Sequence, residues 1–117
     1  MSQIAPTLPK LSNAATAVLE DTGPLKEATG HEMSTSALTI WKGDNGAETG
    51  IWECTPGPSR WDLETNEFVH ILSGRMTVTR DGESPVDIGP GDTVLFEKGW
   101  GGTWEIAETI RKIYVIF

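Results

Sequence analysis

The side chain best placed for chemistry is the carboxylate of Glu67, at the start of an apolar run that ends at Ser73. Alternate side chains of an extended run share a face, so Glu67 is predicted to lie beside Val69 and Ile71. A carboxylate on a half-buried apolar face is costly unless it is paired. It is then either an acid or base whose pKa burial shifts, or half of a structural ion pair. Its candidate partners are Arg60, Arg111 and the hydroxyl group of Tyr114.

A second carboxylate, Glu53, lies in a short run whose two faces carry different chemistry. Alternation puts Glu53 and Ile51 on one face, and Trp52 and Cys54 on the other. If Glu53 points inward, it forms a carboxylate pair with Glu67, which suits acid–base catalysis. If Cys54 points inward instead, we expect a small buried apolar side chain, because no histidine is placed to activate the thiol as a nucleophile.

The elements that must position these groups are short apolar runs cut by Gly, Pro, Asp and Asn, which is the pattern of strands and turns. About nine short strands are predicted, in a sandwich or barrel. Asp81-Gly82 favours a two-residue hairpin turn with positive φ at both positions, and residues 99–102 are predicted as a loop. The only candidate helix, 13–20, is weakened by its β-branched residues. The clearest strand predictions are 36–42, 47–55, 67–73, 75–80, 83–88, 93–96, 103–107 and 110–117.

From Gly50 to Phe117 the sequence resembles the cupin superfamily, and more narrowly the small single-domain cupins related to ureidoglycine aminohydrolase. The resemblance implies an all-β jelly-roll barrel, or double-stranded β-helix, with an inner pocket. It also implies a homodimer in which the N-terminal arm or an edge strand crosses to the partner. The segments that carry the resemblance are Gly50–Cys54 (GIWEC), Asn66–Gly74 (NEFVHILSG), Gly89–Asp92 (GPGD), Thr103–Glu105 (TWE) and Arg111–Tyr114 (RKIY).

The histidines that hold a metal in the cupin motifs are missing from their positions. In the first motif, Gly-x5-His-x-His-x3–4-Glu-x6-Gly, this sequence retains Glu67 and Gly74. In the second motif the histidine position falls on Gly102. The two histidine positions of the first motif fall on Trp61 and Leu63 with a three-residue spacer, or on Arg60 and Asp62 with a four-residue spacer.

A transition metal at such a site needs three or four nitrogen or oxygen ligands in a preset geometry. Glu67, alone or with Asp62, offers oxygen donors for at most a weakly held divalent cation. His70 lies three positions after Glu67, so it is predicted to face the opposite side, and His31 is expected in an exposed loop. We therefore expect no tightly bound metal and no other cofactor.

By resemblance, Glu67 points into the barrel and is the candidate catalytic residue. Three tryptophans near the mouth either fill the core or form a stacking platform for a sugar, a heterocycle or a cation. The predicted pocket residues are Glu53, Arg60, Trp61, Asp62, Leu63, Glu67, Trp100, Gly102, Trp104, Arg111 and Tyr114.

Composition sets outer limits on partners and compartment. The chain has 117 residues, enough for one domain, with 9 basic and 17 acidic residues and a net charge of −8. This charge argues against binding nucleic acid or an anionic membrane surface. One cysteine excludes an intrachain disulfide, and no signal peptide or membrane span is visible, so a cytoplasmic protein is expected. Residues 1–13 are predicted to be a flexible arm and 14–117 a single cupin domain.

Three functions remain open at this point. The first is a metal-independent cupin that binds a small polar metabolite, with a pocket shaped by Glu67, Arg60 and the tryptophans. The second is an enzyme of ureidoglycine aminohydrolase type, acting on C–N bonds through a weakly held metal or through carboxylate acid–base chemistry. The third is a non-catalytic structural or regulatory dimer, which a barrel filled by Trp61 and its neighbours would favour.

Overall fold

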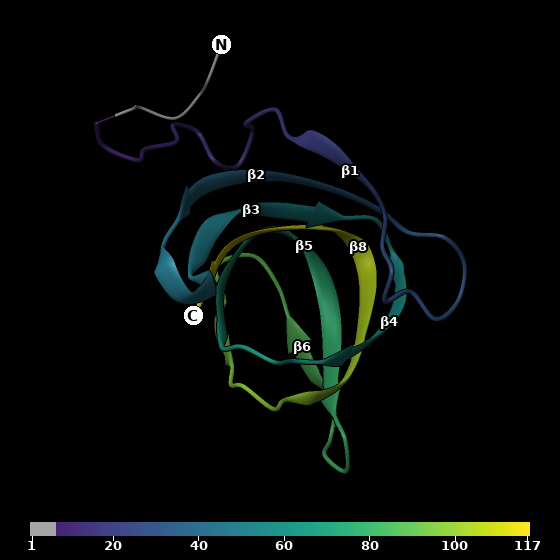
Figure 1. Cartoon of the computed structure of the whole chain (residues 1–117). Coiled ribbons are helices and arrows are strands. Elements are labelled where there is room, and N and C mark those ends of the chain that lie inside the picture. The colour runs from purple at the N-terminus through teal and green to yellow at the C-terminus, as the bar shows by residue number, and fades with distance from the viewer. Residues whose placement is uncertain (1–6) are drawn as a thin grey trace.

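The computed structural model describes residues 7–117, which form an all-β barrel without an α-helix (Figure 1). Its one helical segment is a 3₁₀ turn, Asp44–Gly46. The strands are β1 (Glu20–Pro24), β2 (Ser34–Lys42), β3 (Glu48–Cys54), β4 (Gly57–Asp62), β5 (Glu67–Arg80), β6 (Val86–Ile88), β7 (Thr93–Phe96) and β8 (Gly101–Ile116). No helix in the described part of the chain has the length and apolar character needed to cross a membrane.

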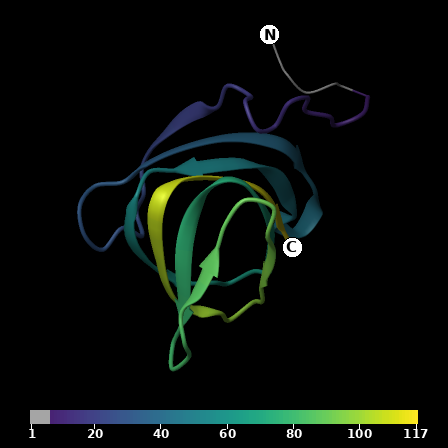
Figure 2. The same ribbon diagram turned by 180° about the vertical axis from the view of Figure 1, so that it is seen from behind.

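All pairings between these strands are antiparallel, and the two longest strands organise the sheet. The order is β1-β2-β3-β8-β5-β6, with β4 also paired to β8 and β7 to β5. β5 and β8 run together from Glu67↔Ile116 to Arg80↔Gly102, and three register shifts near Gly74 interrupt the pairing. Gly74 has φ +89°, and a Cβ there would lie 2.1 Å from the carbonyl oxygen of Thr109. Glycine therefore permits the close approach at the bend of the two strands, which wrap around the barrel axis in both views (Figures 1 and 2).

The core lies inside the barrel, where alternate side chains of the strands meet. In β5, Glu67, Val69 and Ile71 are buried while the intervening Phe68 is exposed, so the predicted alternation is present. Met76 and Val78, further along β5, are also in the core. Other strands and the loop before β2 contribute further core residues, which include Met33, Cys54, Ile88, Phe96, Trp104, Ile106 and Ile110.

The segment before β1 is fastened to the outside of the barrel. The guanidinium group of Arg111 donates hydrogen bonds to the carbonyl oxygens of Ala14 and Ala17, at 3.0 and 2.9 Å. In Figures 1 and 2 this segment lies on the outer side of β2 and leads into β1. Residues 7–13 contain no helix or strand, and the first six residues of the predicted arm lie outside the described part of the chain.

Some element boundaries differ from the sequence-based predictions. The runs 67–73 and 75–80 form one bent strand, as do 103–107 and 110–117, and β8 begins inside the predicted loop 99–102. β1 and β4 were missed because glycine, proline and acidic residues resemble turn composition. The candidate helix 13–20 is only a turn. At Asp81-Gly82 only the glycine has a positive φ, +78°, and the turn closes through a hydrogen bond from the Glu83 amide to the Arg80 carbonyl oxygen.

Candidate functional site

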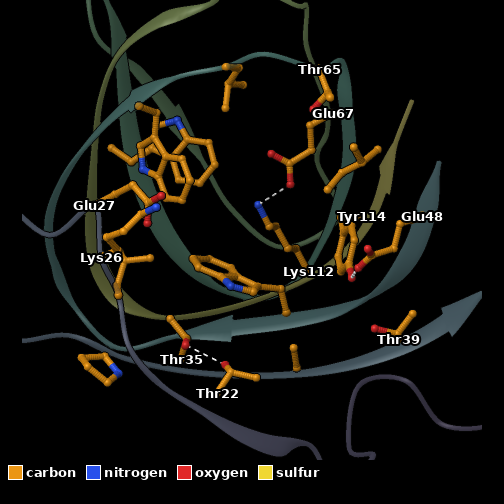
Figure 3. A pocket seen from close by; sticks show the side chains of 18 residues that line it. Thr22, Lys26, Glu27, Thr35, Thr39, Glu48, Thr65, Glu67, Lys112 and Tyr114 are labelled. Carbon is orange, nitrogen blue, oxygen red and sulfur yellow. Dashed lines mark hydrogen bonds and ion pairs between the residues drawn. The ribbon is translucent and has the colours of Figure 1, made fainter. Parts of the chain in front are cut away.

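A cavity of about 570 Å³ lies inside the barrel, lined by strands β1 to β5, by β8 and by the loops after β1 and β4 (Figure 3). A volume of this size is typical of a small-molecule site. Its wall combines three tryptophans with charged and hydroxyl groups, which are Trp52, Trp61, Trp104, Lys26, Glu27, Glu48, Glu67, Lys112, Tyr114, Thr22, Thr35, Thr39 and Thr65.

The most buried charges in the cavity wall form an ion pair between Glu67 and Lys112. Lys112 Nζ donates to Glu67 Oε2 at 2.9 Å, and the two side chains are 5% and 12% exposed. Glu67 opens β5 and faces inward with Val69, while Lys112 faces inward from β8 with Tyr114. The pair compensates two charges that burial alone would make very costly.

Two tryptophan faces complete the surroundings of the Lys112 ammonium group. Nζ lies 4.6 Å from the ring centroid of Trp52 and 4.6 Å from that of Trp104. This distance is well within the range of a cation–π interaction, which strengthens when the cation is desolvated. The register places Trp52 of β3 directly opposite Lys112, so the sheet itself builds one side of the arrangement.

The tryptophans pack on one another along one wall. Trp61 and Trp104 stack with centroids 4.4 Å apart and planes at 27°, and Trp52 meets both edge-on at 6.5 Å. Trp61 Nε1 donates to Ser59 Oγ at 2.8 Å. Trp104 is 1% exposed, and its Nε1 is the one buried side-chain nitrogen or oxygen in the described residues without a hydrogen-bond partner. The wall therefore contains an unused donor.

Tyr114 and Glu48 form a second polar contact in the wall. The Tyr114 hydroxyl donates to Glu48 Oε2 (Figure 3), and burial together with this acceptor raises the pKa of the tyrosine above its usual range. Nearby, the hydroxyl groups of Thr22 and Thr35 lie 2.6 Å apart, and that of Thr35 donates to the Gly23 carbonyl oxygen at 2.9 Å. These contacts fix polar groups at the cavity surface.

Part of the predicted pocket set lines this cavity, namely Trp61, Leu63, Glu67, Trp104 and Tyr114. Arg60 and Asp62 lie outside it, because their side chains leave the opposite face of β4. Arg60 joins Asp62 and Asp81 on the surface at 2.8 and 2.7 Å. Its hydrogen bonds lower the pKa values of both aspartates. Arg60, one of the candidate partners of Glu67, therefore does not pair with it, and its predicted place in the pocket is wrong.

Glu53, Arg111, Trp100 and Gly102 also lie outside the cavity lining. Arg111 Nε donates to Glu53 Oε2 at 2.8 Å, so the two form an ion pair with each other and neither reaches Glu67. Trp100 packs against Phe96, with centroids 5.1 Å apart. The alternatives for β3 are now resolved: Cys54 is in the core and Glu53 is not, so no Glu53–Glu67 carboxylate pair forms. Burial raises the pKa of the Cys54 thiol to about 11.

Lys112 is the functional candidate that the sequence analysis missed. The alternation of residues 110–117 does carry a signal, since Lys112 shares a face with Ile110, Tyr114 and Ile116. A lysine on the apolar face of a strand needs a buried acid, and Glu67 meets that need. Trp52 and Glu48 were missed as pocket residues as well, because the sequence did not decide which face of β3 points inward.

The donor set of the cavity does not fit a transition metal. Trp61 and Leu63, the histidine positions of the three-residue spacer, line the cavity but offer no ligand atoms. At Gly102 a Cβ would lie 2.2 Å from the Thr79 carbonyl oxygen, so no side chain fits there. In residues 7–117 no group of three or more His, Cys, Asp or Glu side chains is placed to share a metal ion.

The two histidines lie away from the cavity. His70 sits on β5 opposite Thr93 and Ile113, three positions after Glu67. His31 Nε2 is 2.9 Å from the carbonyl oxygen of Pro56 in an exposed loop, as predicted for this residue.

The jelly-roll sheet, the inward Glu67 and the internal cavity define a small cupin barrel. The model of the EutQ-like cupin domain matches residues 41–114, so the chain belongs to this family. No functionally curated protein matches the sequence.

Solved structures agree with this fold. A DUF861 family protein of unknown function from Pseudomonas syringae superposes with a TM-score of 0.80 at 19% identity over 88% of this chain; this chain spans 46% of that protein. The putative ethanolamine utilization protein Q of Salmonella typhimurium gives a TM-score of 0.66 at 18% identity, covering 81% of this chain and 76% of its own. A DUF861 family protein from Thermotoga maritima is 37% identical over 57% of this chain and 76% of its own, with a TM-score of 0.56.

Proposed function

We propose that the barrel binds a small polar organic molecule without a tightly held metal. The observation that carries this proposal is the buried Glu67–Lys112 pair in the wall of a cavity of about 570 Å³. A mostly apolar cavity with a few fixed polar groups is the usual composition of a ligand site. Trp61 does not fill this space, which weighs against a solid barrel with a purely structural role.

The polar groups indicate which kind of molecule fits. The cavity wall carries both kinds of group, with the Lys112 ammonium as a donor and the carboxylates of Glu27 and Glu48 as acceptors. A ligand that carries both an acceptor oxygen and an amino or amide N–H satisfies both kinds of group. Small amino acids, ureido compounds and amino alcohols have this chemistry.

A thermal-shift screen tests the proposal. The panel should contain small amino acids, ureido compounds and amino alcohols, with ethanolamine among them because of the description of the Salmonella relative. A binder raises the Tm of the wild-type protein and loses this effect in Glu67→Ala, whereas Arg60→Ala, at an ion pair outside the cavity, retains it. If no compound of these classes raises the Tm, or if Glu67→Ala responds as wild type does, the proposal fails.

A second candidate is C–N bond chemistry of ureidoglycine aminohydrolase type. The contact at 2.9 Å between Glu67 and Lys112 favours it, since a carboxylate and an ammonium group in one cavity can pass a proton to and from a ligand. The test is ammonia release from ureidoglycine, alone and with added Mn²⁺, in wild type and in Glu67→Gln. Ammonia release that depends on Glu67 supports this candidate, and its absence under both conditions refutes it.

We further propose that two copies pair through the outer face of β7, β5 and β8. Leu95, Phe68 and Val115 are opposite one another in the register of these strands, and they are 50%, 43% and 38% exposed. An unbroken row of large apolar side chains on adjacent strands is unusual for a surface that faces only water.

A further inference from the structure

The surviving residue of the cupin metal motif, Glu67, is occupied by a cation that belongs to the protein itself. Lys112 Nζ lies 2.9 Å from Glu67 Oε2, close enough for a charge-assisted hydrogen bond. Figure 3 shows the two side chains pointing at each other across the cavity wall. The other positions of the motif offer nothing that competes for the carboxylate.

The position of the ammonium group is fixed from three sides. Glu67 holds it in front, and the faces of Trp52 and Trp104 lie 4.6 Å from Nζ. With a side chain only 5% exposed, Lys112 has exchanged most of its water for these partners. Two indole faces and a carboxylate are the groups that select an ammonium ion when it is a ligand.

The same contacts leave no place for a metal beside Glu67. A divalent ion bound to this carboxylate would have to lie next to the ammonium charge and against indole rings that supply no lone pairs. Trp61 and Leu63 contribute no donor atoms, and Gly102 has no room for a side chain.

We propose that the Lys112 ammonium group is the resident cation of this barrel, holding the place beside Glu67 that a metal ion takes in metal-binding cupins. This inference holds whether or not the cavity binds a metabolite, and so it is independent of the function proposed above. The resident cation supplies fixed hydrogen-bond donors and a positive charge, but no open coordination position and no redox chemistry.

The site left by removing Lys112 should therefore take a free primary alkylammonium ion. Lys112→Ala deletes three methylene groups and the amine, which n-propylammonium replaces atom for atom. We expect n-propylammonium chloride to raise the Tm of Lys112→Ala saturably, on the order of 5 °C at about ten times its Kd. The matched neutral compound n-propanol should not do so, and neither wild type nor Lys112→Met should respond to the amine beyond the effect of equal NaCl.

Two results in this assay overturn the proposal. Equal stabilisation by n-propanol means that the site recognises volume and not charge. No response of folded Lys112→Ala to n-propylammonium means that Glu67 and the indole faces do not select a cation.

A measurement on wild-type protein decides the matter even if Lys112→Ala does not fold. In a lysine-selective ¹H–¹⁵N spectrum, Lys112 should give an ammonium signal shifted upfield by the two indole faces and absent from Lys112→Met. Added Mn²⁺ should leave this signal unbroadened. A spectrum with only solvent-exposed lysine signals, or selective broadening of the Lys112 signal by Mn²⁺, contradicts a resident ammonium at Glu67.

Discussion

Replacing Lys112 by methionine isolates the energetic role of the buried ion pair. The substitution keeps an unbranched side chain of similar length beside Trp52 and Trp104 but removes the charge that lies 2.9 Å from Glu67. Glu67, whose side chain is 12% exposed, then remains in the cavity wall without a cation. The loss of stability should come from this uncompensated carboxylate rather than from lost packing.

The size of the effect follows from burial. Removing one partner of a buried ion pair costs about 3–5 kcal/mol. Because the pair borders a cavity that water can enter, we expect the lower end, about 3 kcal/mol, or a decrease in Tm of roughly 12 °C for a domain of this size. The double variant Lys112→Met/Glu67→Gln should lose less than the sum of the two single variants, since no unpaired charge remains.

The assay is chemical denaturation of the four proteins of this cycle at pH 7, with Arg60→Met as a matched control. That control also removes a positive charge, but the Arg60 side chain is 40% exposed and its ion pairs are on the surface. The denaturation midpoint of Arg60→Met should therefore barely differ from that of wild type. Additivity of the two cavity substitutions within about 0.5 kcal/mol would refute the coupling inferred from the structure.

Three further predictions concern the core, the second motif and the outer face. Burial raises the pKa of the Cys54 thiol to about 11, so native protein should resist iodoacetamide at pH 8 while unfolded protein reacts. The free energy of unfolding should also decrease as the pH rises from 9 through 11, because the thiol ionises first in the unfolded chain. Rapid alkylation of native protein would contradict the burial. Gly102→Ala should lower the Tm far more than Gly101→Ala. At Gly102 a Cβ would lie 2.2 Å from a backbone oxygen, whereas at Gly101 it would meet only side-chain atoms at 3.2 Å or more. Equal decreases in Tm would show that the backbone of β8 moves to accommodate a side chain at Gly102. Light scattering should find that Phe68→Asp is monomeric and that wild type is dimeric. Val86 is also exposed but lies on β6, so Val86→Asp should remain dimeric. Identical masses for all three proteins would refute pairing through Phe68.

Most strands were predictable because their signals are local, whereas their arrangement as a jelly roll was predicted from the resemblance to cupins. Alternation in Glu67–Ile71 and the turn residues at Gly89–Asp92 specify strands and reversals without knowledge of distant contacts. The sequence did not show that β5 and β8 are each one continuous strand, because each passes through a bend whose composition is typical of a break between strands. Register shifts around Gly74 let one strand continue through that bend, and they depend on the partner strand.

The site was predictable only where a single strand decides the direction of a side chain. Alternation within β5 placed Glu67 on one face with Val69 and Ile71, and the resemblance to cupins turned that face inward. Its partner was not predicted, because the candidates were Arg60, Arg111 and Tyr114, and Lys112 was not among them. The identity of the partner depends on which face of β4 and of β8 turns inward, because the side chains of adjacent residues on a strand point to opposite faces. Lys112 faces the cavity, whereas Arg111 binds Glu53 and the segment before β1 on the outside.

The side chains that replace the metal ligands make sense as a set. The structure selects the three-residue spacer, because Trp61 and Leu63 line the cavity while Arg60 and Asp62 do not. Without histidines or a metal, Glu67 would be a lone carboxylate among aromatic rings, which is a strongly destabilising arrangement. Lys112 removes that cost, and the tryptophans that exclude ligand atoms also provide the faces on which an ammonium ion is stable. The same residues therefore explain both why the cavity is unsuited to a metal and why its carboxylate can remain buried.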